Sequence, residues 1–226
     1  MLVPSDSSKR FLASTAHRYH QALRDREKSE AVYEYLTAER GLTEETLGGY
    51  LVGFVDDAAE GHEAASGFIS IPYLTSRCIV DIRFRRPPDS EKPYKYYTLP
   101  GHPTRVFGTW AIDQSVRTIA ISEGEIDAMS ATQAGIPCVG IPGVKAWKDY
   151  YPRIFAGYDE VVVFSDNDDT KGDETEGVGL KFANTVARDL SEVGVDTRVV
   201  LMPEGHDVNS FMKEEGEYEL RAYAGA

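Results

Sequence analysis

The sequence predicts two architectures in series: an α+β first part, with helices and a small antiparallel sheet, and an α/β second part with a mainly parallel, four-stranded central sheet. The second part is predicted because apolar runs alternate with helical stretches from residue 118 onward. The first part is predicted because short strand-like runs follow one another there with only turns or loops between them. We place the boundary after residue 112, which gives domains at 1–112 and 113–226.

Helices open the first part. An amphipathic stripe predicts a helix over 9–28. Ser29 is placed to cap a second helix that runs through residue 39 and stops at Gly41, and Thr43 is placed to cap a short third helix. Four strands are then expected in the antiparallel sheet: 67–73, 78–86, 95–99 and 105–107.

The second part is expected to contain four strands and three helices between them. The strands are predicted at 118–122, 137–141, 160–165 and 196–201. The helices are predicted at 125–134, 147–155 and 176–192. The runs at 119–121 and 161–164 are apolar at every position, which is typical of buried strands in a parallel sheet.

Carboxylates follow two of these strands. Glu123 comes directly after the strand at 118–122, and Asp127 falls in the first turn of the next helix. Asp166 and Asp168 follow the strand at 160–165, and alternate residues of an extended segment face the same way. Because open α/β sheets hold their ligands at the carboxyl ends of the strands, we expect these four side chains to converge.

Four convergent carboxylates require a cation. At about 5 Å and an effective dielectric constant near 20, two such charges repel each other by about 3 kcal/mol. Mg²⁺ binds oxygen ligands and is the expected ion, with Mn²⁺ as the alternative. For either stretch alone, acids that flank a strand for solubility are an equally good explanation. The two stretches together favour a metal site.

These residues resemble a known family. An apolar strand followed by Glu-Gly-x-x-Asp, and a second one followed by Asp-x-Asp, is similar to the TOPRIM fold that DNA primases, topoisomerases and some nucleases share. Glu123, Gly124, Asp127, Asp166 and Asp168 occupy its motif positions. The resemblance implies that the second part is a TOPRIM metal-binding catalytic domain.

A third acidic segment follows the last predicted strand. Gly205-His206-Asp207-Val208-Asn209 resembles the primase segment in which a glycine precedes an acidic pair near the metal ions. Asp207 fills the first acidic position, and Asn209 stands where a second acid is often found. Asp207 is equally well placed to cap a helix over 208–214, so both roles stay open.

Basic residues collect in the sheet of the first part. The net charge is −13, but residues 1–112 contain 14 Lys and Arg against 15 Asp and Glu, whereas residues 113–226 contain 10 against 22. Four basic residues lie among four aromatic ones: Arg83, Arg85, Lys92 and Lys95 with Phe84, Tyr94, Tyr96 and Tyr97. This combination contacts phosphates and stacks the bases of single strands. The alternative is a solvated sheet face with aromatic residues packed beneath it.

The same sheet resembles the N-terminal subdomain of the DnaG-type primase core. The matching segments are Ile71-Pro72-Tyr73, Arg83-Phe84-Arg85, Pro93-Tyr94-Lys95-Tyr96 and Val106-Phe107-Gly108. The family places basic residues of this sheet against template DNA and incoming nucleotide. The resemblance therefore implies that Arg83, Arg85, Lys92 and Lys95 bind nucleic acid or nucleotide.

The two resemblances together imply a DNA primase of phage- or plasmid-like minimal form, a DNA-directed RNA polymerase. Such a nucleotidyltransferase makes short RNA primers on single-stranded DNA from ribonucleoside triphosphates, with Mg²⁺, during DNA replication. Asp127, Asp166 and Asp168, with help from Asp207, would hold the metal. Glu123 would be a further ligand or the general base.

Composition limits the cofactors and the location. Cys78 and Cys138 lie in apolar surroundings and are expected as free thiols in a reducing compartment. Neither belongs to a closely spaced cysteine pair, so no zinc site is expected in this chain. No apolar run reaches 18 residues and the N-terminus lacks the order of a signal peptide, so we expect a cytoplasmic protein without membrane contact, in the host cytoplasm if viral.

The expected partners are a single-stranded DNA template, ribonucleoside triphosphates, and a replicative helicase or a separate zinc-binding chain. The zinc module that aids template recognition in the family has no counterpart here, so a catalytically poor relative and a shortened chain stay open. Two other functions also stay open: a TOPRIM nuclease that is Mg²⁺-dependent, and a non-catalytic nucleic-acid-binding TOPRIM protein. The match of the basic sheet favours polymerisation over cleavage.

Overall fold

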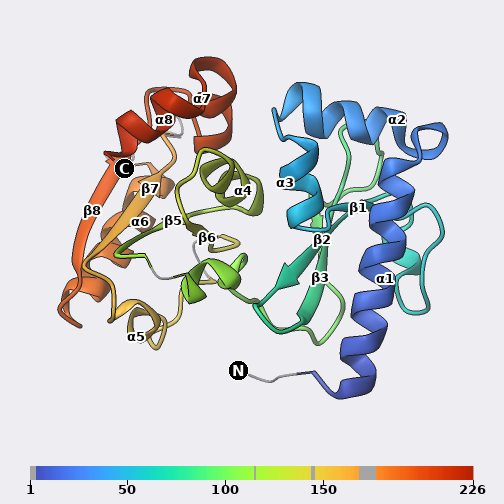
Figure 1. Cartoon of the computed structure of the whole chain (residues 1–226), viewed down its shortest axis with the longest axis horizontal. Helices are drawn as coiled ribbons and strands as arrows, with labels where there is room; N and C mark the ends of the chain where they lie inside the picture. The colour runs from blue at the N-terminus through green and yellow to red at the C-terminus, as the bar shows by residue number, and fades with distance from the viewer. Residues whose placement is uncertain (1–3, 115, 144–145, 168–176, 226) are drawn as a thin grey trace. The chain divides into compact units, whose positions relative to one another are not determined.

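The computed structural model describes residues 4–114, 116–143, 146–167 and 177–225 (Figure 1). The chain divides into two compact units, Met1–Pro103 and Thr104–Ala226. Residues 104–112, which the sequence analysis assigned to the first domain, belong to the second unit, where Val106 and Ala111 lie in the core. Among the described helices, none combines the length and the apolar character that crossing a lipid bilayer requires.

The first unit begins with helices. α1 (Asp6–Arg24) is followed after one residue by α2 (Arg26–Glu34), which continues as a π-helical turn over Tyr35–Glu39. The predicted cap at Ser29 is wrong: α2 begins three residues earlier, and the buried Ser29 hydroxyl donates to the carbonyl oxygens of Leu23 and Asp25. Ser29 thus connects α2 to the end of α1. The start of α2 differs from the prediction because only one residue separates the two helices.

The third helix begins as predicted. α3 (Glu44–Gly49) is capped by the Thr43 hydroxyl, which accepts a hydrogen bond from the backbone N–H of Thr46. Gly41 has a φ of +67°, the left-handed conformation that ends the preceding helical segment.

An antiparallel sheet of order β1-β2-β3-β4 completes the first unit. Its strands are β1 (Gly53–Phe54), β2 (Ile69–Leu74), β3 (Ile79–Arg85) and β4 (Tyr96–Tyr97). A single 3₁₀ turn, η2 (Glu63–Ala65), lies in the loop between β1 and β2. α1 packs on one face of the sheet and buries Leu12, Ala16 and Tyr19 against Phe68 and Phe84 (Figure 1). The antiparallel sheet is confirmed: three of the four predicted strands correspond to β2, β3 and β4, whereas β1 was not predicted.

The fourth predicted strand, 105–107, does not join this sheet. Phe107 instead forms an antiparallel bridge with Gly140 in the second unit, with backbone N···O distances of 2.8 and 3.1 Å. Gly140 belongs to an edge strand, whose outer backbone groups are open to such pairing. β1 takes the edge position in the first sheet, and a two-residue strand has no periodicity that the sequence could reveal.

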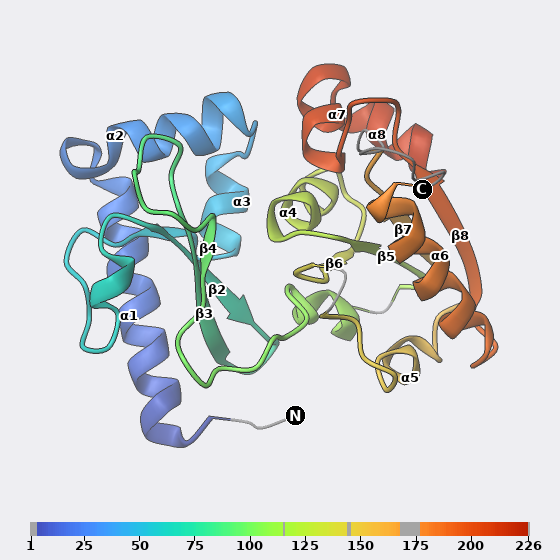
Figure 2. The same ribbon diagram turned by 180° about the vertical axis from the view of Figure 1, so that it is seen from behind.

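The second unit contains the predicted parallel sheet, with the strand order β6-β5-β7-β8 (Figure 2). The strands are β5 (Thr118–Ser122), β6 (Cys138–Gly140), β7 (Glu160–Ser165) and β8 (Asp196–Leu201). The helices are α4 (Glu125–Gln133), α5 (Pro152–Phe155), α6 (Val178–Ser191), α7 (Val208–Glu215) and α8 (Glu217–Ala224), and a 3₁₀ helix, η3 (Thr109–Asp113), precedes β5. The predicted helix at 147–155 is helical only over its last four residues.

The parallel sheet is covered on both faces because alternate residues of its strands point to opposite sides. Ile119, Ile121, Val161 and Val163 pack in one core with residues of α5 and α6. The residues between them, such as Ala120 and Val162, are also buried and point to the other face, where α4 lies. The sheet is therefore a rigid base from which the polar side chains at its carboxyl edge are held.

Candidate functional site

The turn from β5 into α4 is packed tightly around two glycines. Gly124 is the N-cap residue of α4, and a Cβ placed on it would lie 2.7 Å from Oδ2 of Asp127. A Cβ placed on Gly140 would lie 2.7 Å from the carbonyl oxygen of Gly124. Gly140 leaves no room for a side chain because its neighbour is backbone, and a side chain at Gly124 would displace the Asp127 carboxylate. The two glycines thus let α4 start directly behind Glu123 with the Asp127 carboxylate folded back over the turn.

Glu123 and Asp166 meet at the beginning of α6. A Cβ placed on Gly179 would lie 2.8 Å from Oε1 of Glu123, 2.6 Å from the carbonyl oxygen of Asp166 and 3.2 Å from its amide nitrogen. Both acidic residues are half-buried. The carboxyl ends of β5 and β7 therefore bring these two predicted site residues onto the same glycine, as expected for neighbouring parallel strands.

Asp127 is held by the start of α7. It is 9% exposed, and its Oδ1 accepts a hydrogen bond of 3.2 Å from the backbone N–H of Asn209. The buried side-chain amide of Asn209 donates to Oγ of Ser130, one turn further along α4, at 2.9 Å. Asn209, which the sequence analysis placed at a second acidic position, thus fixes α7 to the helix that carries Asp127.

Asp207 caps α7. Its Oδ1 accepts a hydrogen bond of 2.6 Å from the backbone N–H of Ser210, and its own N–H donates to Oγ of Ser210 at 3.0 Å. The preceding loop is tied to the end of β7, since the N–H of Asn167 donates to the carbonyl oxygen of His206. The capping role of Asp207 is therefore present, and the residue lies on a segment directly connected to the one that follows Asp166.

Asp168 lies outside the described residues. In the described ranges, from which 168–176 are excluded, no group of three or more His, Cys, Asp or Glu side chains is close enough to hold a metal ion. The described donors are nevertheless carboxylates on adjoining segments, the hard oxygen ligands that suit Mg²⁺. The ligand set of Asp127, Asp166, Asp168, Asp207 and Glu123 remains a prediction.

The charge of Asp127 reaches into the sheet. Burial raises the pKa of the Cys138 thiol to about 12, a hydrogen bond to Ser122 opposes this, and the negative charge of Asp127 adds to it. Cys138 is a free, fully buried thiol. It therefore stays protonated and takes no part in the chemistry at this edge.

The basic residues of the first sheet separate into two kinds. Arg85 is 6% exposed, and its guanidinium donates to the hydroxyls of Tyr35, at 2.8 Å, and of Tyr96. The Arg40 guanidinium donates to the same Tyr35 hydroxyl at 2.9 Å, and that of Arg83 lies 4.2 Å from the centre of the Tyr96 ring. Arg83 and Arg85 are alternate residues of β3 and share one face, but Arg85 is held inside the unit.

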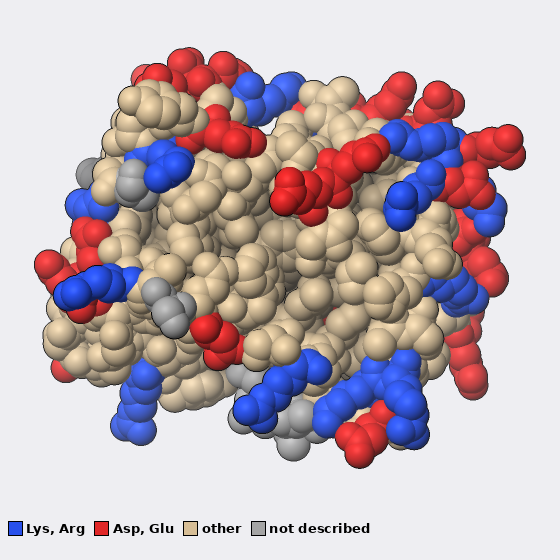
Figure 3. Space-filling view, in the orientation of Figure 1, with Lys and Arg blue, Asp and Glu red and all other residues tan. Residues whose placement is uncertain are grey.

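The remaining two predicted residues, Lys92 and Lys95, are exposed. The loop that carries them is fixed to β3, because the N–H of Arg86 donates to the carbonyl oxygen of Lys95 at 2.9 Å. On the face drawn in Figure 3, the described Lys and Arg side chains form separate groups among acidic ones, and no continuous basic band is visible.

The aromatic residues of the sheet also fall into two groups, those in the core and one beside the arginines. Phe84 is fully buried, and Tyr94 and Tyr97 are half-buried against the same core, with ring centres 5.6 Å apart. For these three, the alternative of aromatic residues packed beneath a sheet face is the observed one. Tyr96 lies with the arginines instead.

Sequence reasoning missed two residues of the acidic edge. Gly179 had a signal, since a glycine and small residues usually open the helix after the Asp-x-Asp motif in the TOPRIM family. The longer link in this chain obscured it. Ser130 had a weaker signal, because it lies three residues after Asp127 on the same helix.

The comparisons with known proteins agree with this architecture. Residues 120–212 match the family described as Toprim-like. The Gene 57 protein of Mycobacterium phage D29 is 38% identical over 159 residues, which cover 68% of this chain and 95% of that protein. The match extends into both units, since it is longer than either unit alone.

Solved primase cores have the same fold. A DNA primase domain from Pseudomonas aeruginosa has a TM-score of 0.74 with 22% identity, and the similarity covers 96% of this chain and 78% of that one. The DnaG primase catalytic domain bound to single-stranded DNA has a TM-score of 0.72 with 16% identity, and the similarity covers 96% and 80%. The chain therefore belongs to the family that includes the phage D29 Gene 57 protein, a TOPRIM-domain family with the fold of a DnaG-type primase catalytic core.

Proposed function

We propose that the chain is the catalytic core of a DNA primase, which makes short RNA primers on single-stranded DNA from ribonucleoside triphosphates. The observation that carries the proposal is the convergence of Glu123 and Asp166 on Gly179, at the carboxyl ends of two neighbouring parallel strands of a Toprim-like domain. Metal-assisted phosphoryl transfer requires ligands in fixed positions. Acidic residues at strand ends are more rigidly positioned than residues in the middle of a loop.

Asp166 and Asp168, with Asp127 and Asp207, are the proposed Mg²⁺ ligands, and Glu123 is a further ligand or the general base. When bound, Mg²⁺ would supply charge neutralisation for the triphosphate and activation of the primer hydroxyl. Asn209 holds Asp127 through its backbone N–H, so its role is that of a positioning residue. Gly179 leaves the space in which the Glu123 carboxylate lies.

The antiparallel sheet would bind the template and the triphosphate through Arg83, Arg85, Lys92 and Lys95. Lys92 and Lys95 are exposed and suit contacts with phosphates. The buried Arg85 would act chiefly by holding Tyr96, over which Arg83 lies. A replicative helicase or a separate zinc-binding chain is the expected protein partner.

Incorporation of labelled ribonucleotides on a single-stranded DNA template tests the activity. The full chain is compared with Asp166→Ala and Asp168→Ala, and with Glu192→Ala as a matched control at an exposed acid of the second unit. We expect Mg²⁺-dependent products of a few nucleotides with the unchanged chain and the control. In both aspartate variants the rate of incorporation should fall at least 100-fold, roughly the effect of removing one acid–base or electrostatic group from an active site.

The competing functions give different results in this assay. Mg²⁺-dependent cleavage of the template without incorporation would replace the primase with a nuclease. Binding of single-stranded DNA with neither reaction would identify a non-catalytic binding protein. Activity that survives both aspartate substitutions would contradict the proposed ligands.

The basic sheet has its own test. Lys95→Ala should weaken single-stranded DNA binding and reduce the slope of log K against log salt by about 0.7 to 1, because one phosphate contact is lost. Arg153→Ala, at an exposed cation on α5, is the control. Unchanged affinity of Lys95→Ala would remove this loop from the binding surface.

A further inference from the structure

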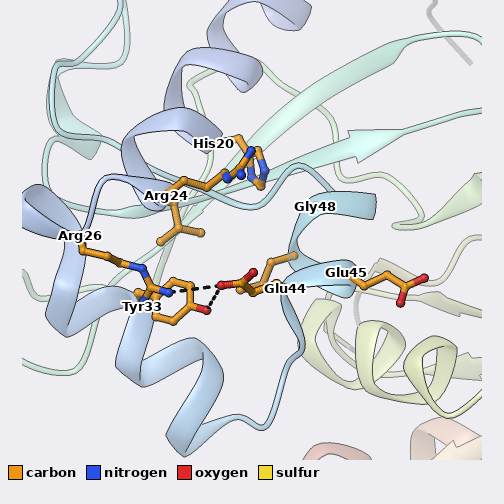
Figure 4. Close-up of a pocket in the computed structure, with 9 residues that line it drawn as sticks. His20, Arg24, Arg26, Tyr33, Glu44, Glu45 and Gly48 are labelled. Carbon is orange, nitrogen blue, oxygen red and sulfur yellow. Dashed lines mark hydrogen bonds and ion pairs between the residues drawn. The ribbon is translucent and has the colours of Figure 1, made fainter.

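A pocket of about 400 Å³ opens in the first unit, and none of the predicted site residues lines it (Figure 4). It lies between the end of α1, the start of α2 and the short helix α3. Its lining contains two cations and two acids, together with polar and apolar side chains: Arg24, Arg26, Glu44, Glu45, His20, Tyr33, Leu23 and Leu47. The volume falls at the lower end of the range of small-molecule sites, about 300 to 1,000 Å³.

One side of the pocket has its charges balanced. The Arg26 guanidinium lies over the Tyr33 ring and donates to Oε1 of Glu44 at 3.3 Å. The Tyr33 hydroxyl donates to the same oxygen at 2.6 Å, and Figure 4 shows these three side chains turned toward one another. The carboxylate of Glu45 points away from them. The charge of Glu44 is thus offset by Arg26.

The other side carries a cation without a counter-ion. Arg24 lies four residues after His20 on α1, so both side chains are on the same side of the helix, and both line the pocket. Within the described ranges, Arg24 has no hydrogen bond or ion pair with another side chain. With Arg26 and Glu44 paired, Arg24 leaves this end of the pocket positive. A positive end beside an apolar floor, made by the buried Leu23 and Leu47, selects an anion that has an uncharged, partly apolar body.

His20 further restricts which ligands can fit the pocket. Its Nδ1 lies 2.7 Å from the carbonyl oxygen of Val52. A carbonyl oxygen only accepts, so Nδ1 must carry the hydrogen, and Nε2 of the neutral ring is an acceptor. A guanidinium beside a hydrogen-bond acceptor complements a phosphate that stands next to a hydroxyl group, as in a phosphorylated ribose.

Gly48 keeps the pocket open. It lies in α3, its φ is not in the left-handed region, and a Cβ placed on it would meet nothing within 4 Å. Glycine inside a helix costs about 1 kcal/mol relative to alanine, and neither backbone conformation nor crowding requires it here. Gly49, the next residue of the same helix, is equally open but does not line the pocket, which makes it a matched control.

We propose that this pocket binds a nucleoside monophosphate. The phosphate is placed at Arg24, a ribose hydroxyl donates to Nε2 of His20, and the base lies over Leu23 and Leu47. The site is independent of the proposed catalytic function, since none of its residues comes from the acidic edge of the second unit and no metal ion is needed.

The test is calorimetric titration of the full chain with AMP and with GMP in the presence of EDTA. Adenosine and inorganic phosphate are titrated separately as the two halves of the ligand. We expect the unchanged chain to bind both monophosphates and to bind adenosine or inorganic phosphate at least tenfold more weakly. AMP should bind at least tenfold more weakly to Gly48→Leu and to Arg24→Gln. Its binding to Gly49→Leu should be unchanged.

Each other outcome overturns the proposal. Equal affinities of Gly48→Leu and Gly49→Leu would place the ligand elsewhere. If inorganic phosphate bound as tightly as AMP, the site would be a simple anion contact at Arg24 and the nucleoside would contribute nothing. Binding that appears only with Mg²⁺ and is lost in Asp166→Asn would assign the nucleotide to the acidic edge. Arg24→Gln changes an exposed position and keeps the test valid if Gly48→Leu does not fold.

Discussion

Gly179→Ala tests the convergence of the two acidic strand ends most directly. The added Cβ would lie 2.6 Å from the carbonyl oxygen of Asp166 and 2.8 Å from Oε1 of Glu123. Non-bonded heavy atoms prefer roughly 3.5 Å or more, so one or both neighbours must move by about 0.7 to 0.9 Å. The Asp166 carbonyl is backbone at the end of a buried strand and yields poorly, so much of the displacement should fall on the Glu123 carboxylate.

The expected free-energy change follows from two opposing effects. Overpacking of this kind costs about 1 to 3 kcal/mol. The alanine also improves the propensity of α6, which returns at most about 1 kcal/mol. We therefore expect the free energy of unfolding of the second unit to fall by about 1 kcal/mol or more. We also expect the affinity for Mg²⁺ to fall about tenfold, the usual effect of disturbing a group that orients a metal ligand.

Urea unfolding and Mg²⁺ calorimetry provide the measurements. Both tryptophans of the chain, Trp110 and Trp147, lie in the second unit, so their fluorescence reports on the unit that contains Gly179. Gly157→Ala is the matched control: it lies in the same unit, its φ is not in the left-handed region, and a Cβ there meets nothing within 4 Å. If Gly179→Ala behaves like Gly157→Ala in both measurements, Glu123 and Asp166 do not meet on α6.

Three further predictions concern buried groups. Asp127→Ala removes the acceptor of the Asn209 N–H and should lower the free energy of unfolding by about 1.5 to 3 kcal/mol, whereas Asp127→Asn keeps an acceptor oxygen and should lose less in the same fluorescence assay. Burial lowers the pKa of His62 below its ordinary 6.5, so the unfolded chain binds more protons than the folded one. The free energy of unfolding should therefore fall as the pH drops through about 6.5 and level off below the pKa of the folded state. His62→Phe should flatten this dependence in melting curves recorded between about pH 5 and 8. Burial raises the pKa of Cys138 to about 12, so a thiol reagent should label Cys78 in the native protein and Cys138 only on unfolding, as mapped by mass spectrometry.

Each of these has a contrary outcome. Equal stability of the alanine and asparagine variants would mean that the Asn209 hydrogen bond contributes nothing. An unchanged pH profile in His62→Phe would assign the acid sensitivity to other groups. Labelling of Cys138 at the rate of Cys78 under native conditions would show that the sheet opens locally.

The positions of Glu123, Asp127 and Asp166 at strand ends follow from local rules. An apolar strand, a Glu-Gly turn and a helix in direct succession place Glu123 and Asp127 at a strand end, and the parallel order of the strands brings Asp166 to the same glycine as Glu123. The same reasoning failed at Ser29, where a one-residue connection between helices moved the start of α2, and at 105–107, where the free edge of β6 offered Phe107 backbone partners.

The basic sheet shows a different limit. Alternation in β3 puts Arg83 and Arg85 on one face. It cannot show that Arg85 is buried, because its partner Tyr35 comes from a helical segment 50 residues earlier. The pocket beside His20 has no sequence signal for the same reason, since its walls come from three helices.

The sequence by itself determined the two architectures, the strands of the parallel sheet and the acidic residues at its edge, because periodicity and turn chemistry act between near neighbours. Only the tertiary structure decided that Gly179 receives Glu123 and Asp166, that Asn209 holds Asp127 from 82 residues away, and that Arg85 is buried. These contacts depend on how rigid elements far apart in the chain pack against one another, and no local pattern encodes that packing.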